Sequence, residues 1–328
     1  MTDGKRNAYM DFLKGLAIVA VVAGHSLTDV AGGYLLCNVI YSFHMPLLMF
    51  ISAYLEEQNR DKYESQEWKM LCKRAGGLLL PYVSWSILYE VMSGQLWAMD
   101  LKNFGLQLLG YTLTGLWFFP VLFGLKVMHY GYWLLQRKLR RGGLRSGLLP
   151  DMLLCALLEV IAVILAFVTR QPFVINMLSY AIPYFLAVII VGHKELADVM
   201  ESEWLAAGSM LVYLFLFPSF VFHDTNWTTQ VLKIVLSVCV IVICCKAQKI
   251  WEQNRLHTVL CLFGKYSLAI YVMHGFFIDY VVYLDKLESA YLIAASSVLL
   301  AFTVAGVCTG IAWIIECSAW CRKVLFGK

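Results

Sequence analysis

Three residues that can exchange protons or hold an anion, Asp11, Lys14 and His25, lie in one apolar stretch near the N-terminus. In a helix, Asp11 and Lys14 share a face and partly neutralise one another, because residues three apart are neighbours. His25 follows Lys14 by eleven residues, close to three full turns, so the two side chains face the same way, about 16 Å apart along the axis. The spacing therefore places a lysine near the start of the helix and an imidazole, which can act as a base, on one face of one helix.

Two further histidines, His44 and His274, also fall within apolar stretches. If these stretches are helices that cross a membrane in alternate directions, the three imidazoles lie at about 15, 20 and 22 Å from the inner edge, for His44, His274 and His25 in that order. We expect them to meet in one cavity, where neutral imidazoles are available as bases near pH 7. Each histidine alone can instead be structural. A metal site is not expected, because no carboxylate or thiolate stands at ligand spacing.

The elements that must hold these residues are long apolar helices. Hydrophobic residues make up 60% of the 328 residues and charged residues only 15%. Ten apolar runs have spanning length, namely 10–28, 35–54, 76–93, 116–135, 148–168, 174–192, 204–222, 229–246, 260–283 and 290–315. We predict an all-α integral membrane protein with about ten transmembrane helices in one bundle, as a single membrane-embedded domain over residues 1–328. The shorter run 104–115 is interpreted as interfacial or re-entrant.

The distribution of basic residues predicts the orientation of the bundle. Of the 26 lysines and arginines, 19 lie at the termini or in the loops from even to odd helices, and three lie in the loops from odd to even helices. The excess of positive charge marks the cytoplasmic side, so both termini are predicted to be cytoplasmic. The remaining four cations, Lys14, Lys126, Lys233 and Lys265, fall within predicted helices and need individual explanations.

Several other classes of function are not supported. The ten cysteines form no C-x-x-C pair and lie mostly within or beside apolar runs, so we predict packing residues rather than a metal site or disulfides. The formal net charge of +4 forms no basic patch among exposed aromatic residues, so nucleic-acid binding is not expected. The first apolar run lacks a small-residue cleavage site, and we expect it to remain as the first helix.

Four segments carry a more specific pattern. They are Asp11-x-x-Lys14-Gly15 followed by Gly24-His25; Phe43-His44-Met45-Pro46-Leu47 running into Phe50-Ile51-Ser52-Ala53-Tyr54-Leu55; Leu116-Trp117-Phe118-Phe119-Pro120; and Tyr266-Ser267-Leu268-Ala269-Ile270-Tyr271 with His274. With these segments the chain resembles the membrane acyltransferase 3 family, in particular its fucose 4-O-acetylase-like branch. Lys14 stands where arginine is common in the family. Before Leu78-Leu79-Leu80-Pro81-Tyr82, Arg74 matches the first of two arginines that the family often spaces three apart, and Gly77 replaces the second.

The resemblance implies transfer of an acyl group, usually acetyl, from a cytoplasmic coenzyme A thioester to a hydroxyl of a cell-surface glycan or its precursor. In that scheme His25 and Asp11 are catalytic, and Lys14, Lys73 and Arg74 bind the donor. The residues expected to bind the acceptor or to orient other groups are His44, Glu159, Trp117, Tyr271 and His274. The expected co-substrate is acetyl-CoA or another acyl-CoA, with no metal, in a multi-pass protein of the plasma membrane.

Two other interpretations remain open. A helical bundle with central histidine, glutamate and lysine residues is also typical of a solute transporter, although no inverted repeat is visible. Lys14 can also extend to the membrane interface while His25 and Glu159 form hydrogen bonds within the bundle, and Trp117 can be an interfacial anchor instead of a sugar-stacking residue.

Overall fold

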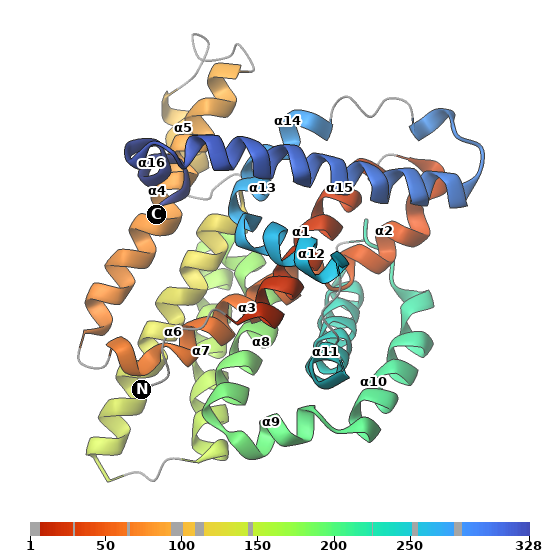
Figure 1. Cartoon of the computed structure of the whole chain (residues 1–328). Coiled ribbons are helices and arrows are strands. Elements are labelled where there is room, and N and C mark those ends of the chain that lie inside the picture. Colours follow the sequence, from red (N-terminus) through yellow and green to blue (C-terminus); the bar gives the residue numbers. More distant parts are fainter. Residues whose placement is uncertain are drawn as a thin grey trace. The chain divides into compact units, whose positions relative to one another are not determined.

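A computed structural model describes residues 7–28, 30–63, 66–92, 101–108, 115–143, 147–224, 226–250, 255–278 and 284–328 (Figure 1). Every regular element in these ranges is an α-helix or a short 3₁₀ turn. The chain folds into two compact units, and helix α3 (His44–Gln58) contributes its first half to one and its second half to the other. The first unit comprises Met1–Ile51 and Glu195–Ile314, and the second comprises Ser52–Lys194 and Ile315–Lys328.

Several helices have the length and hydropathy of membrane spans. Among the described residues, six helices qualify, or up to eight spans if each of two bent helix pairs is one span. This confirms an α-helical membrane protein, whereas the count of ten and the cytoplasmic termini remain predictions. Helices α4 (Glu67–Met92) and α6 (Phe118–Arg141) are long enough to cross but are not among the candidates. Both carry clustered charge. Lys69, Lys73 and Arg74 lie near the start of α4, and Lys138, Arg140 and Arg141 lie at the end of α6.

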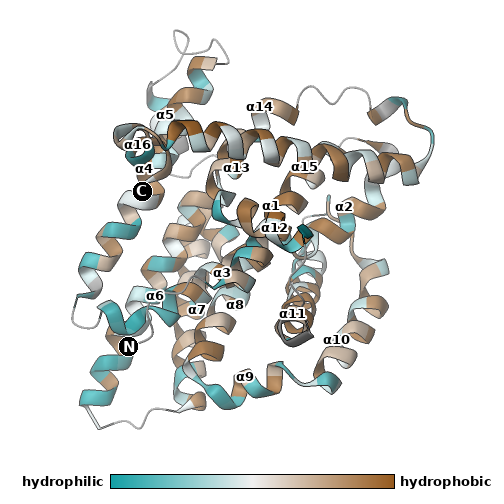
Figure 2. Ribbon diagram, in the orientation of Figure 1, coloured by the Kyte–Doolittle hydropathy of each residue, from teal (hydrophilic) through white to brown (hydrophobic). Residues whose placement is uncertain are grey.

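The exposed surfaces of the apolar helices fit a lipid environment. The most apolar windows of α7 (Leu148–Thr169) and α15 (Ala290–Ile315) are only 28% and 33% buried within the protein. On α7, Phe167 is 80% exposed. Figure 2 shows α15 as hydrophobic along most of its length. Apolar surface of this extent is unfavourable in water but suits the hydrocarbon core of a bilayer.

The first unit contains the segments that carry His25, His44 and His274. Its remaining helices are α1 (Ala8–Leu27), α2 (Tyr34–Tyr41), α9 (Lys194–Met200), α10 (Glu203–Leu216), α11 (Trp227–Ile250), α12 (Arg255–Lys265), α13 (Ser267–Met273), α14 (Gly275–Ile278) and α15. Helix α1 lies against α12, α2, α13 and α14 (Figure 1), and it is buried along most of its length. The N-terminal helix is therefore the centre of this unit.

Two glycines allow α1 and α12 to touch through their backbones. A Cβ added to Gly15 would lie 1.9 Å from the carbonyl oxygen of Leu260, and one added to Gly264 would lie 1.8 Å from that of Asp11. Small residues at such positions are typical of close helix pairs in membranes, where packing drives helix association. Gly15 of the first sequence segment is thus explained by helix packing.

Alanine at Gly15 is expected to force the two helices apart and to lower the free energy of unfolding by about 1–3 kcal/mol. Gly264→Ala should act in the same direction. The matched control is Gly310→Ala on α15, because nothing lies within 4 Å of a Cβ at this position. The control should be neutral or slightly stabilising, since alanine favours helix over glycine. Thermal unfolding in detergent measures the difference, and equal responses at Gly15 and Gly310 would contradict the backbone contact.

The predicted helix over residues 260–283 is broken where the structure describes it, up to Ile278. The chain bends by 69° between α12 and α13, at Tyr266, and α14 follows as a separate short helix. The bend occurs in a run that is apolar throughout, so hydropathy does not report it. Helix α13 then lies against α1 and carries Tyr271 and the capping residue His274 toward it.

The second unit consists of the second half of α3, the helices that follow it as far as Lys194, and the C-terminal helix. These are α4, α5 (Leu101–Leu108), α6, α7, α8 (Pro172–Gly192) and α16 (Ala319–Phe326). Helix α6 lies against α4, α7 and α8, and α16 lies against α4. The predicted interfacial segment 104–115 is a helix up to Leu108, and residues 109–114 lie outside the described ranges.

Candidate active site

The first unit brings three predicted imidazoles together in one cluster, the histidine group (His25, His44 and His274). The ring centroids of His25 and His274 are 5.2 Å apart. Tyr41 lies between the other members, with its ring centroid 6.4 Å from that of His25 and 5.0 Å from that of His44. Helices α1, α3 and α13 thus place side chains from three distant parts of the sequence at one point.

Backbone carbonyls fix the orientation of two members of this group. The Nδ1 atom of His44 lies 2.7 Å from the carbonyl oxygen of Ile40, and that of His274 lies 2.6 Å from the carbonyl oxygen of Tyr271. A carbonyl oxygen only accepts hydrogen bonds, so each Nδ1 carries the hydrogen. In the neutral ring this leaves Nε2 as an acceptor, and both buried rings can therefore accept a hydrogen bond from a hydroxyl.

His25 differs from the other two because its side chain is exposed, although α1 is otherwise largely buried. No residue that the structure describes forms a hydrogen bond with this imidazole. The preceding residue, Gly24, leaves room for Tyr41, since a Cβ there would lie 3.0 Å from Cε2 of the tyrosine ring. His25 is therefore the member of the histidine group that a substrate can reach.

Tyr271 is buried behind His274, with the two ring centroids 5.9 Å apart. Its carbonyl oxygen accepts the hydrogen bond from the imidazole, as described above. The structure therefore places Tyr271 where it positions His274 rather than on the exposed side of the group.

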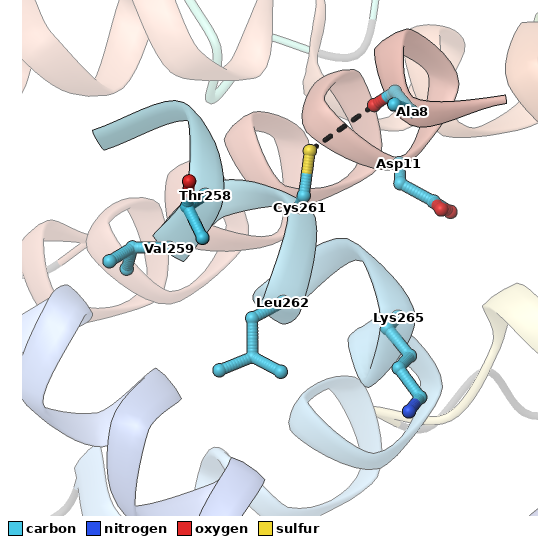
Figure 3. Close-up of a pocket in the computed structure, with 7 residues that line it drawn as sticks. All are labelled: Ala8, Asp11, Thr258, Val259, Cys261, Leu262 and Lys265. Atoms are coloured by element: carbon cyan, nitrogen blue, oxygen red, sulfur yellow. Dashed lines mark hydrogen bonds between the residues drawn. The ribbon is translucent and has the colours of Figure 1, made fainter. Parts of the chain in front are cut away.

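The start of α1 lies beside a pocket of about 420 Å³ that α12 also lines (Figure 3). Asp11 and Lys265 are the charged side chains of its wall, and Cys261 in the same wall lies 3.2 Å, measured from Sγ, from the carbonyl oxygen of Ala8. Helix α1 is unbroken, so the fourteen residues from Asp11 to His25 correspond to about 21 Å. Asp11 is therefore at the opposite end of α1 from the imidazole, near the half-buried Lys14.

Four other predicted residues belong to the second unit. Arg74 donates from Nε to Glu56 at 3.0 Å, and its neighbour Lys73 is exposed. Trp117 stacks on Tyr180, with ring centroids 5.5 Å apart. Glu159 is half-buried on α7 and forms no hydrogen bond or ion pair with the other residues that the structure describes. The structure thus collects His44, His274 and Tyr271 with His25, and places Arg74, Trp117 and Glu159 on other elements.

Gly77, where the resemblance expects a second arginine, lies beside the end of α16. A Cβ on Gly327 would lie 2.6 Å from the Cα of Gly77, and Gly327 adopts a φ of 64°, which favours glycine and ends α16. A Cβ on Gly77 would lie 3.7 Å from the carbonyl oxygen of Gly327, an ordinary contact. The close approach therefore requires glycine at position 327 and does not account for the glycine at position 77.

Comparison with protein families identifies the chain. A family model described as an acyltransferase domain matches residues 7–317, which includes all the candidate site residues of both units. The chain belongs to the acyltransferase 3 family. Searches of curated proteins and of solved structures find no match. As a family member with several apolar helices, it is a multi-pass membrane acyltransferase.

The acyltransferase also contains a buried ion-pair network in its second unit, which sequence reasoning missed. Glu56, near the end of α3, accepts from Lys126 of α6 at 2.7 Å and from Arg74 of α4 at 3.0 Å. The side chains of Glu56 and Lys126 are only 4% and 6% exposed. Burying such charges is favourable only when they are paired, so Glu56 neutralises cations from two other helices.

Glu57 makes a second set of contacts from the next position of α3. Its carboxylate accepts from Nε2 of His129 at 2.8 Å, from the indole of Trp133 at 2.7 Å and from Arg60 at 3.1 Å. Arg60 also donates to Gln136 at 2.5 Å. Because two of these donors, His129 and Trp133, lie on α6, this carboxylate links α3 to α6 in the acyltransferase fold.

The sequence contained one signal for this network, namely Lys126 among the cations inside predicted helices. Glu56 and Glu57 follow residue 54, where the predicted second helix ends. That boundary is wrong, because α3 continues to Gln58 and buries both carboxylates. Their partners on α6 are 70 residues or more away in the sequence, so only the fold brings them together.

Proposed function

We propose that this acyltransferase moves an acetyl group from cytoplasmic acetyl-CoA to a hydroxyl of a cell-surface glycan or its precursor, in the plasma membrane. The family supports acyl transfer in general. The observation that carries the proposal is the exposed imidazole of His25, 5.2 Å from His274 and on the same helix as Lys14. An accessible base is what transfer to a hydroxyl requires, because a hydroxyl is a poor nucleophile until it loses its proton.

In the proposed reaction the His25 imidazole takes the proton of the acceptor hydroxyl as the oxygen attacks the thioester carbonyl. A new C–O bond forms, the C–S bond breaks, and the thiolate of coenzyme A leaves and takes a proton from the imidazolium. The reaction is balanced without a further reactant. The same imidazole can alternatively carry the acetyl group between donor and acceptor. Both routes require His25, and the Nε2 atoms of His44 and His274 are available to orient the hydroxyl.

The donor is proposed to approach from the start of α1. Lys14 and His25 lie on one unbroken helix about 16 Å apart, comparable to the reach of a pantetheine arm. The phosphates of the donor can therefore stay near Lys14 while the thioester reaches the imidazole. Asp11 belongs to this donor end. Lys73 and Arg74 of α4 are proposed as further donor-binding residues.

Acetyl-CoA turnover by the purified protein in lipid nanodiscs tests the proposal. With acetyl-labelled donor and no added acceptor, we expect slow release of labelled acetate, above the level of empty nanodiscs. If the imidazole carries the acetyl group, labelled free coenzyme A should also exchange into unlabelled acetyl-CoA. A solute carrier would do neither. If acetyl-CoA is neither hydrolysed nor exchanged, and added envelope glycans acquire no label, the proposed acetyl transfer is wrong.

A further inference from the structure

Four aromatic side chains of the first unit form a row that leads to the histidine group, which we call the aromatic row (Tyr34, His223, Phe222 and Tyr41). The ring centroids are 6.1 Å apart for Tyr34 and His223, 3.7 Å for His223 and Phe222, and 4.8 Å for Phe222 and Tyr41. From Tyr41 the next ring is His25, at 6.4 Å. The row therefore connects one end of the unit to the proposed general base in successive ring contacts.

The row is open to a ligand at its outer end. Tyr34 is 47% exposed, and His223 is exposed as well, whereas Phe222 and Tyr41 are half-buried. Tyr34 is the first residue of α2, and His223 lies between η4 (Phe217–Ser219) and α11. Both residues follow the outer ends of predicted spans, on the side that the charge distribution predicts to be extracytoplasmic. This is the side opposite to the proposed donor end of α1, so an acceptor and a donor can approach His25 from different ends.

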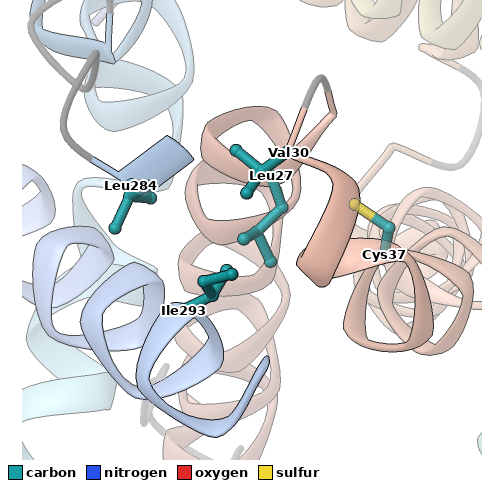
Figure 4. Close-up of a cluster of buried hydrophobic side chains, with 5 residues drawn as sticks. All are labelled: Leu27, Val30, Cys37, Leu284 and Ile293. Carbon is teal, nitrogen blue, oxygen red and sulfur yellow. The ribbon is translucent and has the colours of Figure 1, made fainter. Parts of the chain in front are cut away.

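The inner half of the row is supported by a compact apolar cluster. Tyr41 and Phe222 pack against buried side chains from α1, α2, the 3₁₀ turn at Leu284, α15 and the connection between α1 and α2. Figure 4 shows these side chains together, namely Leu27, Val30, Cys37, Leu284 and Ile293. Because these side chains come from four elements and one connection, the two rings rest on a rigid base. A rigid aromatic surface loses little entropy when it binds a ligand.

Hydrogen bonds fix the same two rings in position. The backbone N–H of Phe222 donates to Oδ1 of Asn38 on α2 at 3.1 Å. The hydroxyl of Tyr41 lies 3.4 Å from Oγ1 of Thr28, which itself donates to the carbonyl oxygen of Gly24 at 3.1 Å. The loop that carries Phe222 is thereby tied to α2, and Tyr41 is tied to the last turn of α1 beside His25.

We propose that the aromatic row is the acceptor-binding surface of this acyltransferase and that it binds a neutral sugar ring. The inference rests on the acetyl transfer proposed above. A pyranose has apolar C–H faces and a rim of hydroxyls. Its C–H faces can pack on the flat faces of aromatic side chains, and its hydroxyls can form hydrogen bonds with polar atoms at the edges of those side chains. The tyrosine hydroxyls and imidazole nitrogens of the row supply such edge atoms. The four side chains carry no permanent charge, so they favour a neutral ring over a phosphate or carboxylate. A lipid tail would not need the polar edges.

The test measures how labelled acetyl divides between acceptor and water. Purified protein in nanodiscs receives acetyl-labelled acetyl-CoA and envelope glycans extracted from the cells that make the protein. We expect the double variant Tyr34→Ala/His223→Ala to lower the ratio of acetyl on carbohydrate to free acetate about tenfold. Phe222→Leu keeps apolar packing but removes the ring face, and should lower the ratio similarly. Phe222→Tyr keeps the ring face and should retain a ratio near that of the wild type.

Trp204→Ala is the matched control, because Trp204 is an aromatic residue 88% exposed at the opposite end of α10 from the row. Its ratio should equal that of the wild type. An unchanged ratio in both Tyr34→Ala/His223→Ala and Phe222→Leu would overturn the proposal, as would label found only in lipid or peptide. A purely structural role lowers transfer and hydrolysis together and leaves the ratio constant, which also overturns it. Absence of donor turnover in the wild type is a different result, and would overturn the acetyl transfer itself.

Discussion

Replacing His25 by glutamine is expected to abolish acetyl transfer while the protein remains folded and inserted. Glutamine is of similar polarity but cannot accept a proton near neutral pH or carry an acyl group. Loss of a general base costs about 10²- to 10⁴-fold in rate, and loss of a covalent carrier costs at least as much. The measurement is initial-rate transfer from labelled acetyl-CoA by detergent-purified variants with matched thermal unfolding midpoints. His25→Ala should give the same result.

The histidine group itself provides the controls for this experiment. His44 and His274 each donate from Nδ1 to a backbone carbonyl, at 2.7 Å and 2.6 Å. A glutamine amide also donates, so His44→Gln and His274→Gln should retain part of the orienting function and lose less activity than His25→Gln. Turnover near the wild-type level in His25→Gln would reject the catalytic assignment. Equal losses in all three variants would show that His25 is not distinguished from its neighbours.

The sequence predicts the arrangement of α1 well because a helix has a fixed rise. Helix α1 is unbroken, so the spacing of Lys14 and His25 in the sequence converts directly into a distance along one face. The path of α12 and α13 is different. Their apolar run shows no interruption, yet the chain bends by 69° at Tyr266, and the close contact of Gly264 with α1 is a tertiary feature that hydropathy does not report.

The aromatic row and the buried network of the second unit were missed for related reasons. Phe222 is the last residue of a predicted apolar run, and His223 follows it. Aromatic residues are common there as interfacial anchors, so an aromatic side chain at this position does not by itself indicate a ligand. Glu56 stands at the end of a run, where a carboxylate usually faces water. In both cases the informative observation is the partner, Tyr41 for Phe222 and Lys126 for Glu56, and partners distant in the sequence are set by the fold.

Replacing Glu56 by glutamine is expected to destabilise the protein strongly. Glutamine retains the shape of the side chain but removes the charge that two cations share, Lys126 at 2.7 Å and Arg74 at 3.0 Å. Lys126 is then left buried without a carboxylate, since its side chain is only 6% exposed. Removing one partner of a buried pair costs about 3–5 kcal/mol, because the uncompensated charge cannot return to water. The loss should appear as a lower midpoint of thermal unfolding in detergent.

Adding Lys126→Met to Glu56→Gln should recover most of this stability, because methionine has a similar length and needs no counterion. A buried ion pair can be replaced by apolar residues at little cost, whereas a single charge left behind cannot be tolerated equally well. The matched control is Glu203→Gln, which removes the carboxylate from the pair of Glu203 with Lys246, where the glutamate side chain is 81% exposed. It should cause a much smaller shift than Glu56→Gln, since water already solvates the glutamate and the pair is partly exposed. If Glu56→Gln and Glu203→Gln have the same unfolding midpoint, or if the double variant is no more stable than Glu56→Gln alone, the prediction is wrong. Glu56 would then not be needed to compensate the buried charge of Lys126.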